Sequence, residues 1–386
     1  MKCDLIIVGA GPAGSMAAKI SAEKGLDVVL LEKRQEIGVP VRCGEIVDKR
    51  FFSKLITPDP SWISTETNGA RIYAPDGSSW VISESKSSDS AYYVLERKIF
   101  DRALALKAAQ AGAKIMVKTR ALGLLKKNGR PCGISALHLG EQIKIEAPLI
   151  IGADGIESKV GRWAGIETAL KPEDIGICAQ FLLQDNSIDM DYCEFFLSNQ
   201  FAPGGYVWSF PKGQDLANVG VGIQGSRSKP GEPLRLLKGF IEKKMPNAKI
   251  LNIVVGGVPG SGPLDTFTAD GIMLIGDAAR QSDPLVGAGI AIGMWAGIIA
   301  GEVAANAIEK GDTKRVVLKS YEDRWQDTMG NYISNDYELK QILTKLNDDD
   351  FNDLLHLIGK RNISAMGLIG LLRMLALMAK IRACIK

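Results

Sequence analysis

The sequence predicts an α/β protein in which a parallel, nucleotide-binding sheet is combined with an antiparallel sheet and a helical C-terminal region. Three observations lead to this fold class. A short apolar run over residues 4–8 passes through a glycine turn into a helix-like run. Four runs with period-two alternation lie within residues 171–265. Near the last third of the chain, an apolar strand-like run ends in an acid and a glycine-rich segment follows.

The composition limits the classes of function. The chain has 386 residues and 42 glycines, which suits two domains with many tight turns. Its net charge is only +3, without a basic stripe, so we expect no nucleic-acid partner. Six cysteines without CxxC spacing and two histidines give no metal-like pattern, so we expect no metal site. The first residues do not resemble a signal peptide, and we therefore expect a cytoplasmic protein.

The N-terminal glycine turn predicts a dinucleotide site. It follows the strand at 4–8 and leads into a helix expected over 15–24. Gly9 permits the turn, Gly11 lets the backbone approach a pyrophosphate, and Gly14 lets the helix pack closely on the sheet. The helix N-terminus adds the positive end of a dipole. A second apolar run at 28–31 ends in Glu32, where such folds place the acid that binds ribose hydroxyls.

Three further segments decide between NAD and FAD. A helix opens at 95–101 after a strand, a strand at 151–155 ends in Asp154 and Gly155, and 271–279 runs into Asp277 before a glycine-rich stretch at 283–290. This set resembles the glutathione-reductase-like FAD superfamily, specifically its hydroxylase-like branch. The resemblance implies FAD contacts from Gly9, Gly11, Ala13, Gly14, Glu32, Arg42, Cys43, Gly44, Ile46, Arg97, Ala121, Asp154, Gly155, Asp277, Gly287, Gly289 and Ile290.

The same resemblance divides the chain into alternating segments. We expect FAD-binding parts at 1–65, 96–170 and 266–310, substrate-domain parts at 66–95 and 171–265, and a helical region at 311–386. The uncharged stretch at 284–301 meets the minimum length of a transmembrane helix. Five glycines interrupt it and it follows the acidic turn, so a helix buried beneath the flavin explains it better.

An aromatic strand is expected in the middle of the chain. The period-two runs at 175–183, 192–197, 206–210 and 217–223 suggest an antiparallel sheet. Tyr206, Trp208 and Phe210 fall on one face of their strand because side chains alternate with period two. For an arbitrary strand, such a face is more often sheet core than a ligand surface.

The aromatic strand and a cysteine segment together resemble one enzyme family. Residues 203–211 have the spacing Pro-x-x-Tyr-x-Trp-x-Phe-Pro, and residues 40–45 (Pro-Val-Arg-Cys-Gly-Glu) resemble a cysteine-containing segment beside the flavin. Both are similar to the geranylgeranyl reductase family, which saturates isoprenoid double bonds, and the short chain resembles its archaeal ether-lipid members. The resemblance implies a prenylated glycerophospholipid substrate and a substrate wall of Tyr206 and Trp208. Cys43 then either donates the proton or is a small buried spacer.

A second GxGxxG pattern begins at Gly220 and offers an NADPH site as an alternative. A loop rich in helix breakers follows it where a helix would have to begin, so a glycine-bearing strand is the better interpretation. Without a second nucleotide domain, we expect electrons from a protein carrier such as ferredoxin.

The C-terminal tail mixes cationic and apolar residues. From Lys360 to Lys386 it has six cations and no acid. It either lies at the inner face of an anionic membrane or packs on the protein body, and both remain open. Arg373 near its centre argues against a membrane span.

Two other functions share the expected fold. An oxygen-activating hydroxylase or halogenase would use the same flavin cradle. A prenyl-binding escort protein would not use flavin at all, but the intact Gly9, Gly11, Gly14, Glu32 and Asp277 favour a retained cofactor.

Overall fold

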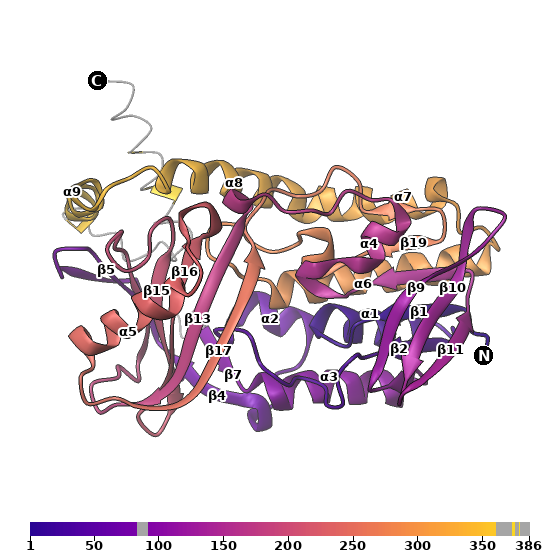
Figure 1. Cartoon of the computed structure of the whole chain (residues 1–386), viewed down its shortest axis with the longest axis horizontal. Helices are drawn as coiled ribbons and strands as arrows, with labels where there is room; N and C mark the ends of the chain where they lie inside the picture. The colour runs from indigo at the N-terminus through magenta and orange to yellow at the C-terminus, as the bar shows by residue number, and fades with distance from the viewer. Residues whose placement is uncertain (83–91, 360–372, 375–377, 379–386) are drawn as a thin grey trace.

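The computed structural model describes residues 1–82, 92–359, 373, 374 and 378. A nucleotide-binding half and a half built on a large sheet lie side by side along the long axis (Figure 1). Helices α7 (Arg315–Trp325) and α8 (Asn331–Leu343) run along the top of both halves in this view. The expected combination of a parallel and a largely antiparallel sheet is confirmed.

The nucleotide-binding half contains a six-stranded sheet in the order β18-β19-β12-β1-β2-β8. Its neighbours pair in parallel except for β18 and β19. The central strands are apolar throughout because both faces of the sheet are covered. The strands are β1 (Leu5–Val8), β2 (Val28–Leu31), β8 (Lys114–Met116), β12 (Leu149–Gly152), β18 (Thr268–Ala269) and β19 (Ile272–Leu274).

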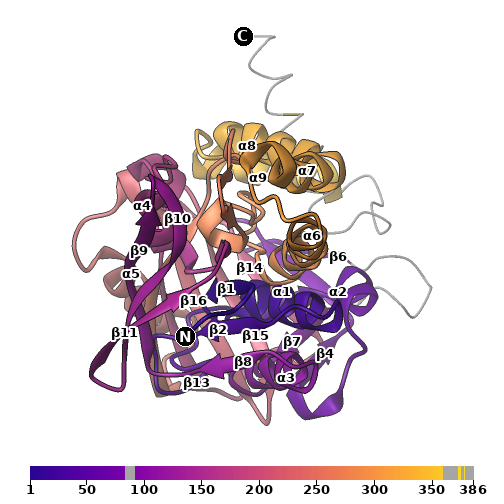
Figure 2. The ribbon, with the colours of Figure 1, turned by 90° about the vertical axis from the view of Figure 1, so that its right-hand side faces the viewer.

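Helices cover one face of this sheet and a small sheet covers the other (Figure 2). The helices are α1 (Pro12–Glu23), α3 (Arg97–Gln110) and α6 (Ile290–Glu309). The opposite side carries β9 (Thr119–Lys127), β10 (Arg130–His138), β11 (Glu141–Glu146) and α4 (Lys159–Ala164). Helix α1 begins earlier than the predicted Ser15, because Pro12 has a backbone suited to the first helical turn.

Helix α6 is the apolar segment whose burial the sequence predicts. Within the described ranges it is long and apolar enough to cross a membrane, yet 72% of its apolar window is buried inside the protein. A Cβ on Gly297 would lie 2.4 Å from the carbonyl oxygen of Ala13, and one on Gly301 would lie 2.9 Å from Ile20. The glycines therefore allow α1 to pack directly on α6. The helix starts at Ile290, so residues 284–289 form the loop before it.

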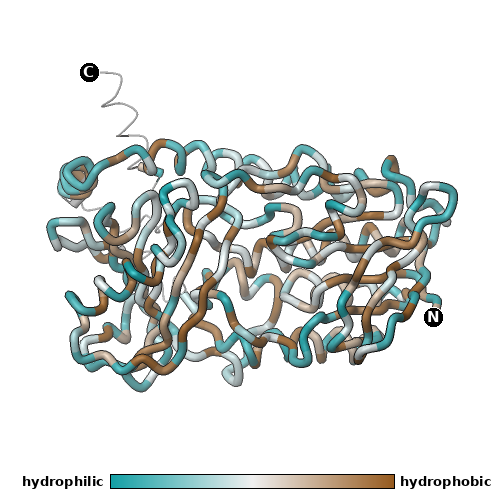
Figure 3. The backbone as a smooth tube through the Cα atoms, viewed as in Figure 1, coloured by the Kyte–Doolittle hydropathy of each residue, from teal (hydrophilic) through white to brown (hydrophobic). Residues whose placement is uncertain are grey.

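The second half is built on a seven-stranded sheet in the order β17-β13-β16-β15-β14-β5-β6. The four predicted strands are present as β13 (Ile175–Gln184), β14 (Tyr192–Phe196), β15 (Tyr206–Gly213) and β16 (Leu216–Gln224). Neighbouring strands are antiparallel except for β14 and β5. The other members are β5 (Gly69–Tyr73), β6 (Ser79–Ile82) and β17 (Lys249–Pro259), and Figure 3 shows the hydrophobic stretches along the long strands β13 and β17.

The two faces of this sheet have different partners. Helix α5 (Glu232–Lys244) packs through Leu237 and Phe240 on the face that carries Phe181 and Val221. The aromatic residues of β15 lie on the opposite face because side chains alternate along the strand. A small sheet of β3 (Ile46–Asp48), β7 (Tyr92–Leu95) and β4 (Ile63–Thr67), with α2 (Lys49–Leu55), connects this face to the nucleotide-binding half.

The C-terminal region is helical, as expected. It contains α7 (Arg315–Trp325), a π-helical turn (Gln326–Gly330), α8 (Asn331–Leu343) and α9 (Asp348–Gly359). The cationic segment from Lys360 to Lys386, expected either at a membrane or on the protein body, lies outside the described residues, except for Arg373, Met374 and Met378. Arg373 donates to the buried carboxylate of Asp336 in α8 at 2.8 Å. At this position the tail packs on the protein body.

Candidate functional site

The glycine turn after β1 has the geometry of a nucleotide cradle. Gly9 has a φ of +110°, and a Cβ there would lie 2.3 Å from the carbonyl oxygen of Ala153. A Cβ on Gly14 would lie 1.9 Å from the carbonyl oxygen of Gly9. A Cβ on Gly11, in contrast, would meet nothing within 4 Å. Protein packing thus explains Gly9 and Gly14, whereas Gly11 borders open space, as a backbone approached by a pyrophosphate requires.

Ala13 links this turn to the other glycine-rich segments. A Cβ on Gly276 would lie 3.1 Å from the Cβ of Ala13, and one on Gly293 would lie 3.4 Å from it. The small side chain of Ala13 therefore lets α1, α6 and the turn that carries Asp277 meet at one place. Segments from both ends of the chain surround the N-terminus of α1.

Glu32 is fixed at the end of β2, beside the glycine turn. Its Oε2 accepts a hydrogen bond from the backbone N–H of Ala10 at 3.2 Å, and its Oε1 accepts one from Arg34 at 2.9 Å. The carboxylate is only partly buried. This arrangement fits an acid that binds the hydroxyls of an adenosine ribose.

Asp154 supplies a carboxylate at the end of β12. Its Oδ2 accepts from the backbone N–H of Val160 at 3.0 Å, whereas its buried Oδ1 has no hydrogen-bond partner among the described residues. Burial raises the pKa of Asp154. Gly155, with a φ of +73°, begins the turn that follows β12. A buried oxygen without a partner fits a site that receives a donor from a ligand.

Asp277 faces the N-terminus of α6. A Cβ on Gly289, the residue that caps this helix, would lie 3.3 Å from the Oδ1 of Asp277. Burial raises the pKa of Asp277, and the positive charge of Arg97 opposes this rise. Gly287, with a φ of +71°, and Ile290 complete the turn into the helix. Asp277 and the glycine-rich turn into α6, both implied by the resemblance to contact FAD, are therefore adjacent.

Arg97 stands at the start of α3 and joins the cradle to the cysteine segment. Its guanidinium binds both oxygens of Asp101 at 2.7 and 2.8 Å. Its charge acts on Asp277 and on the thiol of Cys43. The resemblance implies that Arg97 contacts FAD; the structure pairs its guanidinium with Asp101 and places its charge near Asp277 and Cys43.

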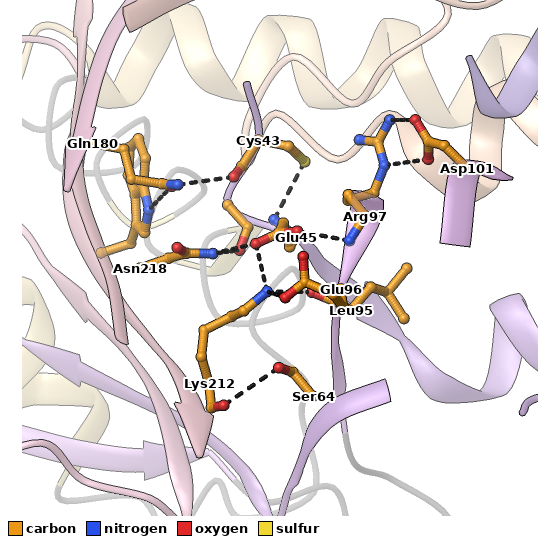
Figure 4. A network of polar contacts seen from close by, with 12 residues as sticks. Cys43, Glu45, Ser64, Leu95, Glu96, Arg97, Asp101, Gln180, Lys212 and Asn218 are labelled. Carbon is orange, nitrogen blue, oxygen red and sulfur yellow. Dashed lines mark hydrogen bonds and ion pairs between the residues drawn. The ribbon is translucent and has the colours of Figure 1, made fainter. Parts of the chain in front are cut away.

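The cysteine segment lies directly against the large sheet (Figure 4). The carbonyl oxygen of Cys43 accepts from the Nε2 of Gln180 at 3.0 Å, and its Sγ accepts from the backbone N–H of Glu45 at 3.2 Å. Burial raises the pKa of Cys43, and the charge of Arg97 lowers it. A Cβ on Gly44 would lie 2.8 Å from the ring of Phe210. Glycine at this position lets the segment touch the aromatic strand.

The neighbouring residues of this segment bridge the two halves. Gly256 of β17 lies against the aliphatic part of Arg42, since a Cβ on this glycine would be 3.6 Å from that side chain. Ile46 begins β3 and pairs with Val94 of β7. Ala121, in contrast, lies in β9, where it pairs with Ala136. The structure therefore places Ala121 in the small sheet that covers the nucleotide-binding half.

The aromatic strand presents one continuous face. The rings of Tyr206 and Trp208 are 5.9 Å apart, and those of Trp208 and Phe210 are 6.2 Å apart. The hydroxyl of Tyr206 donates to the carbonyl oxygen of Val286, in the loop before α6, at 2.6 Å. The three rings therefore face the cysteine segment and the loop at 285–289.

The glycines of the pattern at Gly220 leave space for the rings of this aromatic face. Gly220 and Gly222 lie inside β16, between β13 and β15. A Cβ on Gly220 would lie 2.3 Å from the ring of Trp208. The next residues form a short 3₁₀ turn, and a helix begins only at Glu232. The interpretation as a glycine-bearing strand is confirmed, and its physical reason is the space that the indole ring requires.

A small apolar pocket of about 60 Å³ opens at the end of the aromatic face. Apolar side chains from both halves line it, including Ile72, Phe195, Tyr206, Leu285, Val286, Leu343 and Phe351. Lys340 also lines the pocket, and its ammonium donates to the carbonyl oxygens of Glu173 and Gly260. Burial lowers the pKa of Lys340.

Four polar residues of this region escape the sequence patterns, namely Glu45, Gln180, Lys212 and Asn218. Gln180 is a polar residue within the apolar strand at 175–183, and this exception was a usable signal. Lys212 follows Phe210 by two positions, so period-two alternation places it on the aromatic face. Asn218 is likewise a polar residue within the apolar run at 217–223, and Glu45 is the last residue of the cysteine-containing segment at 40–45.

Comparisons with known proteins agree with this geometry. Residues 174–258 match the geranylgeranyl reductase catalytic domain, residues 59–200 match an FAD binding domain, and residues 7–73 match an NAD(P)-binding Rossmann-like domain. These matches, together with the cradle described above, identify FAD as the cofactor. The residues that fit FAD are Gly11 in the glycine turn, Glu32, Asp154 and Asp277.

Solved structures show the same fold. A geranylgeranyl bacteriochlorophyll reductase-like protein from Thermoplasma acidophilum is 36% identical, with a TM-score of 0.93 over 97% of this chain and 96% of that chain. A flavin-dependent brominase shares the fold at 17% identity, with a TM-score of 0.72 over 100% of both chains.

Curated relatives are more similar in sequence. The digeranylgeranylglycerophospholipid reductase of Methanothrix thermoacetophila is 62% identical over 97% of this chain and 96% of its own length. Digeranylgeranylglycerophospholipid reductase 2 of Methanococcoides burtonii is 52% identical over 96% of this chain and 92% of its own. With this identity over nearly its whole length, and with the catalytic domain of geranylgeranyl reductases in its large sheet, the chain belongs to the digeranylgeranylglycerophospholipid reductase family.

Proposed function

We propose that this protein is an FAD-dependent reductase of the isoprenoid double bonds in geranylgeranyl chains of archaeal ether-lipid precursors. The observation that carries the proposal is the contact between the two family segments. Gly44 lies against the ring of Phe210 and beside Trp208. The cysteine segment, predicted to lie beside the flavin, is therefore in direct contact with the predicted substrate wall. A prenyl chain placed there packs its methyl groups on ring faces next to the cofactor loop.

Bound FAD, once reduced, supplies the hydride for such a reaction. The protein residues have the tasks of binding and orientation. The apolar pocket beyond Tyr206 accepts part of the prenyl chain. The thiol of Cys43 is the proposed proton donor, because burial favours its protonated form.

Lipid analysis tests the function directly. The gene is expressed in a host that makes geranylgeranyl ether lipids, and the lipids are compared by mass spectrometry with those of the same host without it. We expect mass gains in steps of two hydrogens. Gains of oxygen would instead assign the protein to the hydroxylases that share its fold, and unchanged lipids in the presence of a working reductant would reject the proposal.

The proposed electron donor is a low-potential protein carrier such as ferredoxin. The second GxGxxG pattern lies within the sheet around Trp208, which supports a donor other than bound NADPH. Anaerobic bleaching of the flavin is the measurement, with reduced ferredoxin and NADPH compared at equal concentrations. Rapid bleaching by NADPH alone would contradict this assignment.

We also propose that the protein acts at the cytoplasmic face of the cell membrane, where a prenylated lipid substrate is available. The cationic and apolar composition between Lys360 and Lys386 supports contact with anionic lipids. Co-sedimentation with anionic and with neutral vesicles tests this proposal. Equal recovery in the supernatant with both vesicle types would contradict it.

A further inference from the structure

Glu45 uses every polar atom that it has to hold the cysteine segment in place. Its backbone N–H donates to the Sγ of Cys43 at 3.2 Å, and its carbonyl oxygen accepts from the N–H of Leu95 at 2.8 Å. Its Oε1 accepts from the first N–H of helix α3, at Arg97, at 2.7 Å. One residue thus connects the thiol with the elements that carry Arg97.

The second carboxylate oxygen of Glu45, Oε2, contacts residues of the seven-stranded sheet. It accepts from the ammonium of Lys212 in β15 at 2.7 Å and from the amide of Asn218 in β16 at 2.6 Å (Figure 4). The side chains of Lys212 and Glu45 are only 6% and 5% exposed. Lys212 also binds the carbonyl oxygen of Leu95 at 2.8 Å and the carboxylate of Glu96 at 3.0 Å. These hydrogen bonds hold the buried side chains of Glu45 and Lys212 in one arrangement. Removal of either partner would leave the charge of the other buried and unpaired.

The backbone of Glu45 has an unusual conformation that this network maintains. Its φ is +71°, in the left-handed region that non-glycine residues rarely adopt. Such a conformation persists where surrounding contacts determine it. Here it places the N–H on the side of the thiol while the carboxylate contacts Lys212 and Asn218.

We propose that Glu45 is a positioning residue, which acts through its buried pair with Lys212 to hold the Cys43 thiol in place on the side of Arg97. Because the sulfur accepts the N–H of Glu45, the proton of the thiol remains free to point elsewhere. The same N–H bond favours the thiolate and therefore opposes the effect of burial on the pKa of Cys43. The catalytic meaning of this inference rests on the proposed function, but the arrangement itself is testable without turnover.

Two variants separate positioning from simple electrostatics. Glu45→Gln removes a negative charge near the sulfur, and this change alone would lower the pKa of Cys43. The double variant Glu45→Gln with Lys212→Met removes one charge of each sign, so it leaves the net charge unchanged. Glu66→Gln is the matched control, because Glu66 in β4 pairs with Lys49 at the start of α2 and not with the cysteine segment.

The measurement is the pH dependence of iodoacetamide alkylation at Cys43 in the flavin-loaded protein, followed by mass spectrometry of the peptide that contains it. The apparent pKa comes from the shape of the profile, so a change in accessibility that scales all rates does not alter it. We expect a rise of about half to one unit in both Glu45 variants, which slows alkylation about three- to tenfold at a pH below the pKa. The control is expected to keep the profile of the unmodified protein.

Two outcomes would overturn the inference. A lower pKa in Glu45→Gln would show that Glu45 acts on the thiol only by its charge. An unchanged profile in the double variant, with normal flavin content and melting temperature, would show that the segment keeps its geometry without the network. A failure of the proposed lipid reduction would leave both readouts intact, so the two failures are distinguishable.

Discussion

The indole Nε1 of Trp208 donates a hydrogen bond to the Oε1 of Gln180 at 3.0 Å, and the Nε2 of the same glutamine donates to the carbonyl oxygen of Cys43 at 3.0 Å. Gln180 therefore uses both ends of its amide, and its acceptor and donor cannot be exchanged without the loss of both bonds. This side chain therefore joins the substrate wall directly to the cysteine segment.

Replacement of Gln180 by leucine is expected to destabilise the protein. The indole N–H and the carbonyl oxygen of Cys43 would both lose their partner, at about 1 to 3 kcal/mol for each buried group. We expect a loss of roughly 2 to 6 kcal/mol in the free energy of unfolding, measured by urea denaturation of the holoprotein. Gln184→Leu, at the end of the same strand, is the control and should change the free energy of unfolding by at most about 0.5 kcal/mol. Equal stability of the two variants would contradict the role of Gln180.

Gly11→Ala is expected to weaken flavin binding without a loss of stability in the apoprotein. The added methyl group meets no protein atom within 4 Å, and the φ of Gly11 is −75°, which alanine readily adopts. The methyl group would instead occupy space beside the bound pyrophosphate. We expect an unchanged melting temperature of the apoprotein and a lower affinity for FAD in fluorescence titration. Gly123→Ala, which also meets no atom within 4 Å, is the control and should keep both values.

Glu32→Ala is expected to reduce retention of FAD. The carboxylate is held by Ala10 and Arg34, so it is already oriented for the ribose. Loss of a charge-assisted hydrogen bond costs about 1.5 to 3 kcal/mol, which corresponds to roughly ten- to a hundredfold in affinity. Glu23→Ala removes a surface pair with Lys19 and is the control. Full flavin occupancy after dilution of the Glu32 variant would remove this residue from the site.

A buried acid near the loop before α6 predicts a pH effect on stability. Burial and the neighbouring Asp336 raise the pKa of Asp283 to about 6, and Tyr332 donates to its Oδ2 at 2.7 Å. In the unfolded chain an aspartate titrates near about 3.9, so between these values the folded protein binds more protons and stability falls as the pH rises. Arg373 bonds to Asp336, so this cluster also contains a cation.

Asp283→Asn isolates this effect because asparagine does not titrate. The free energy of unfolding of the variant, relative to the unmodified protein, should increase on the order of 2 kcal/mol from pH 4 to pH 7. Chemical denaturation at several pH values is the measurement. A difference that stays constant over this range would show that Asp283 titrates normally in the folded protein.

The sequence predicts local elements here better than contacts between them. The glycine turn, Glu32 and the aromatic strand follow from spacing and periodicity, which depend only on neighbours along the chain. The contact between Gly44 and Phe210 depends instead on how two distant segments pack, and no periodicity encodes it.

The polar network around Glu45 shows the same limit. Its left-handed backbone is unexpected for a glutamate, because local preference disfavours it and only tertiary contacts determine it. The glycine pattern at Gly220 matches a nucleotide-binding turn in sequence but not in structure, because it lies within strand β16. Its true reason, space for the ring of Trp208, becomes visible only in the folded sheet.

The aromatic strand offers the sharpest test of the substrate wall. Trp208 is 7% exposed and lies on the face toward the cysteine segment, whereas Phe181 is fully buried on the opposite face beneath α5. Truncation of either ring to alanine is expected to cost about 3 to 5 kcal/mol of stability. Only Trp208 borders the proposed prenyl site.

Trp208→Ala and Phe181→Ala are therefore compared as folded, flavin-loaded fractions of similar stability. We expect Trp208→Ala to bind the lipid poorly or to reduce a different subset of its double bonds, because part of the substrate surface is missing. Phe181→Ala should give the products of the unmodified protein per flavin. The measurements are melting temperature, flavin content and product distribution by mass spectrometry. Unmodified products from the remaining Trp208→Ala holoprotein would show that Tyr206, Trp208 and Phe210 are ordinary sheet core, because the lost ring would then have affected folding alone.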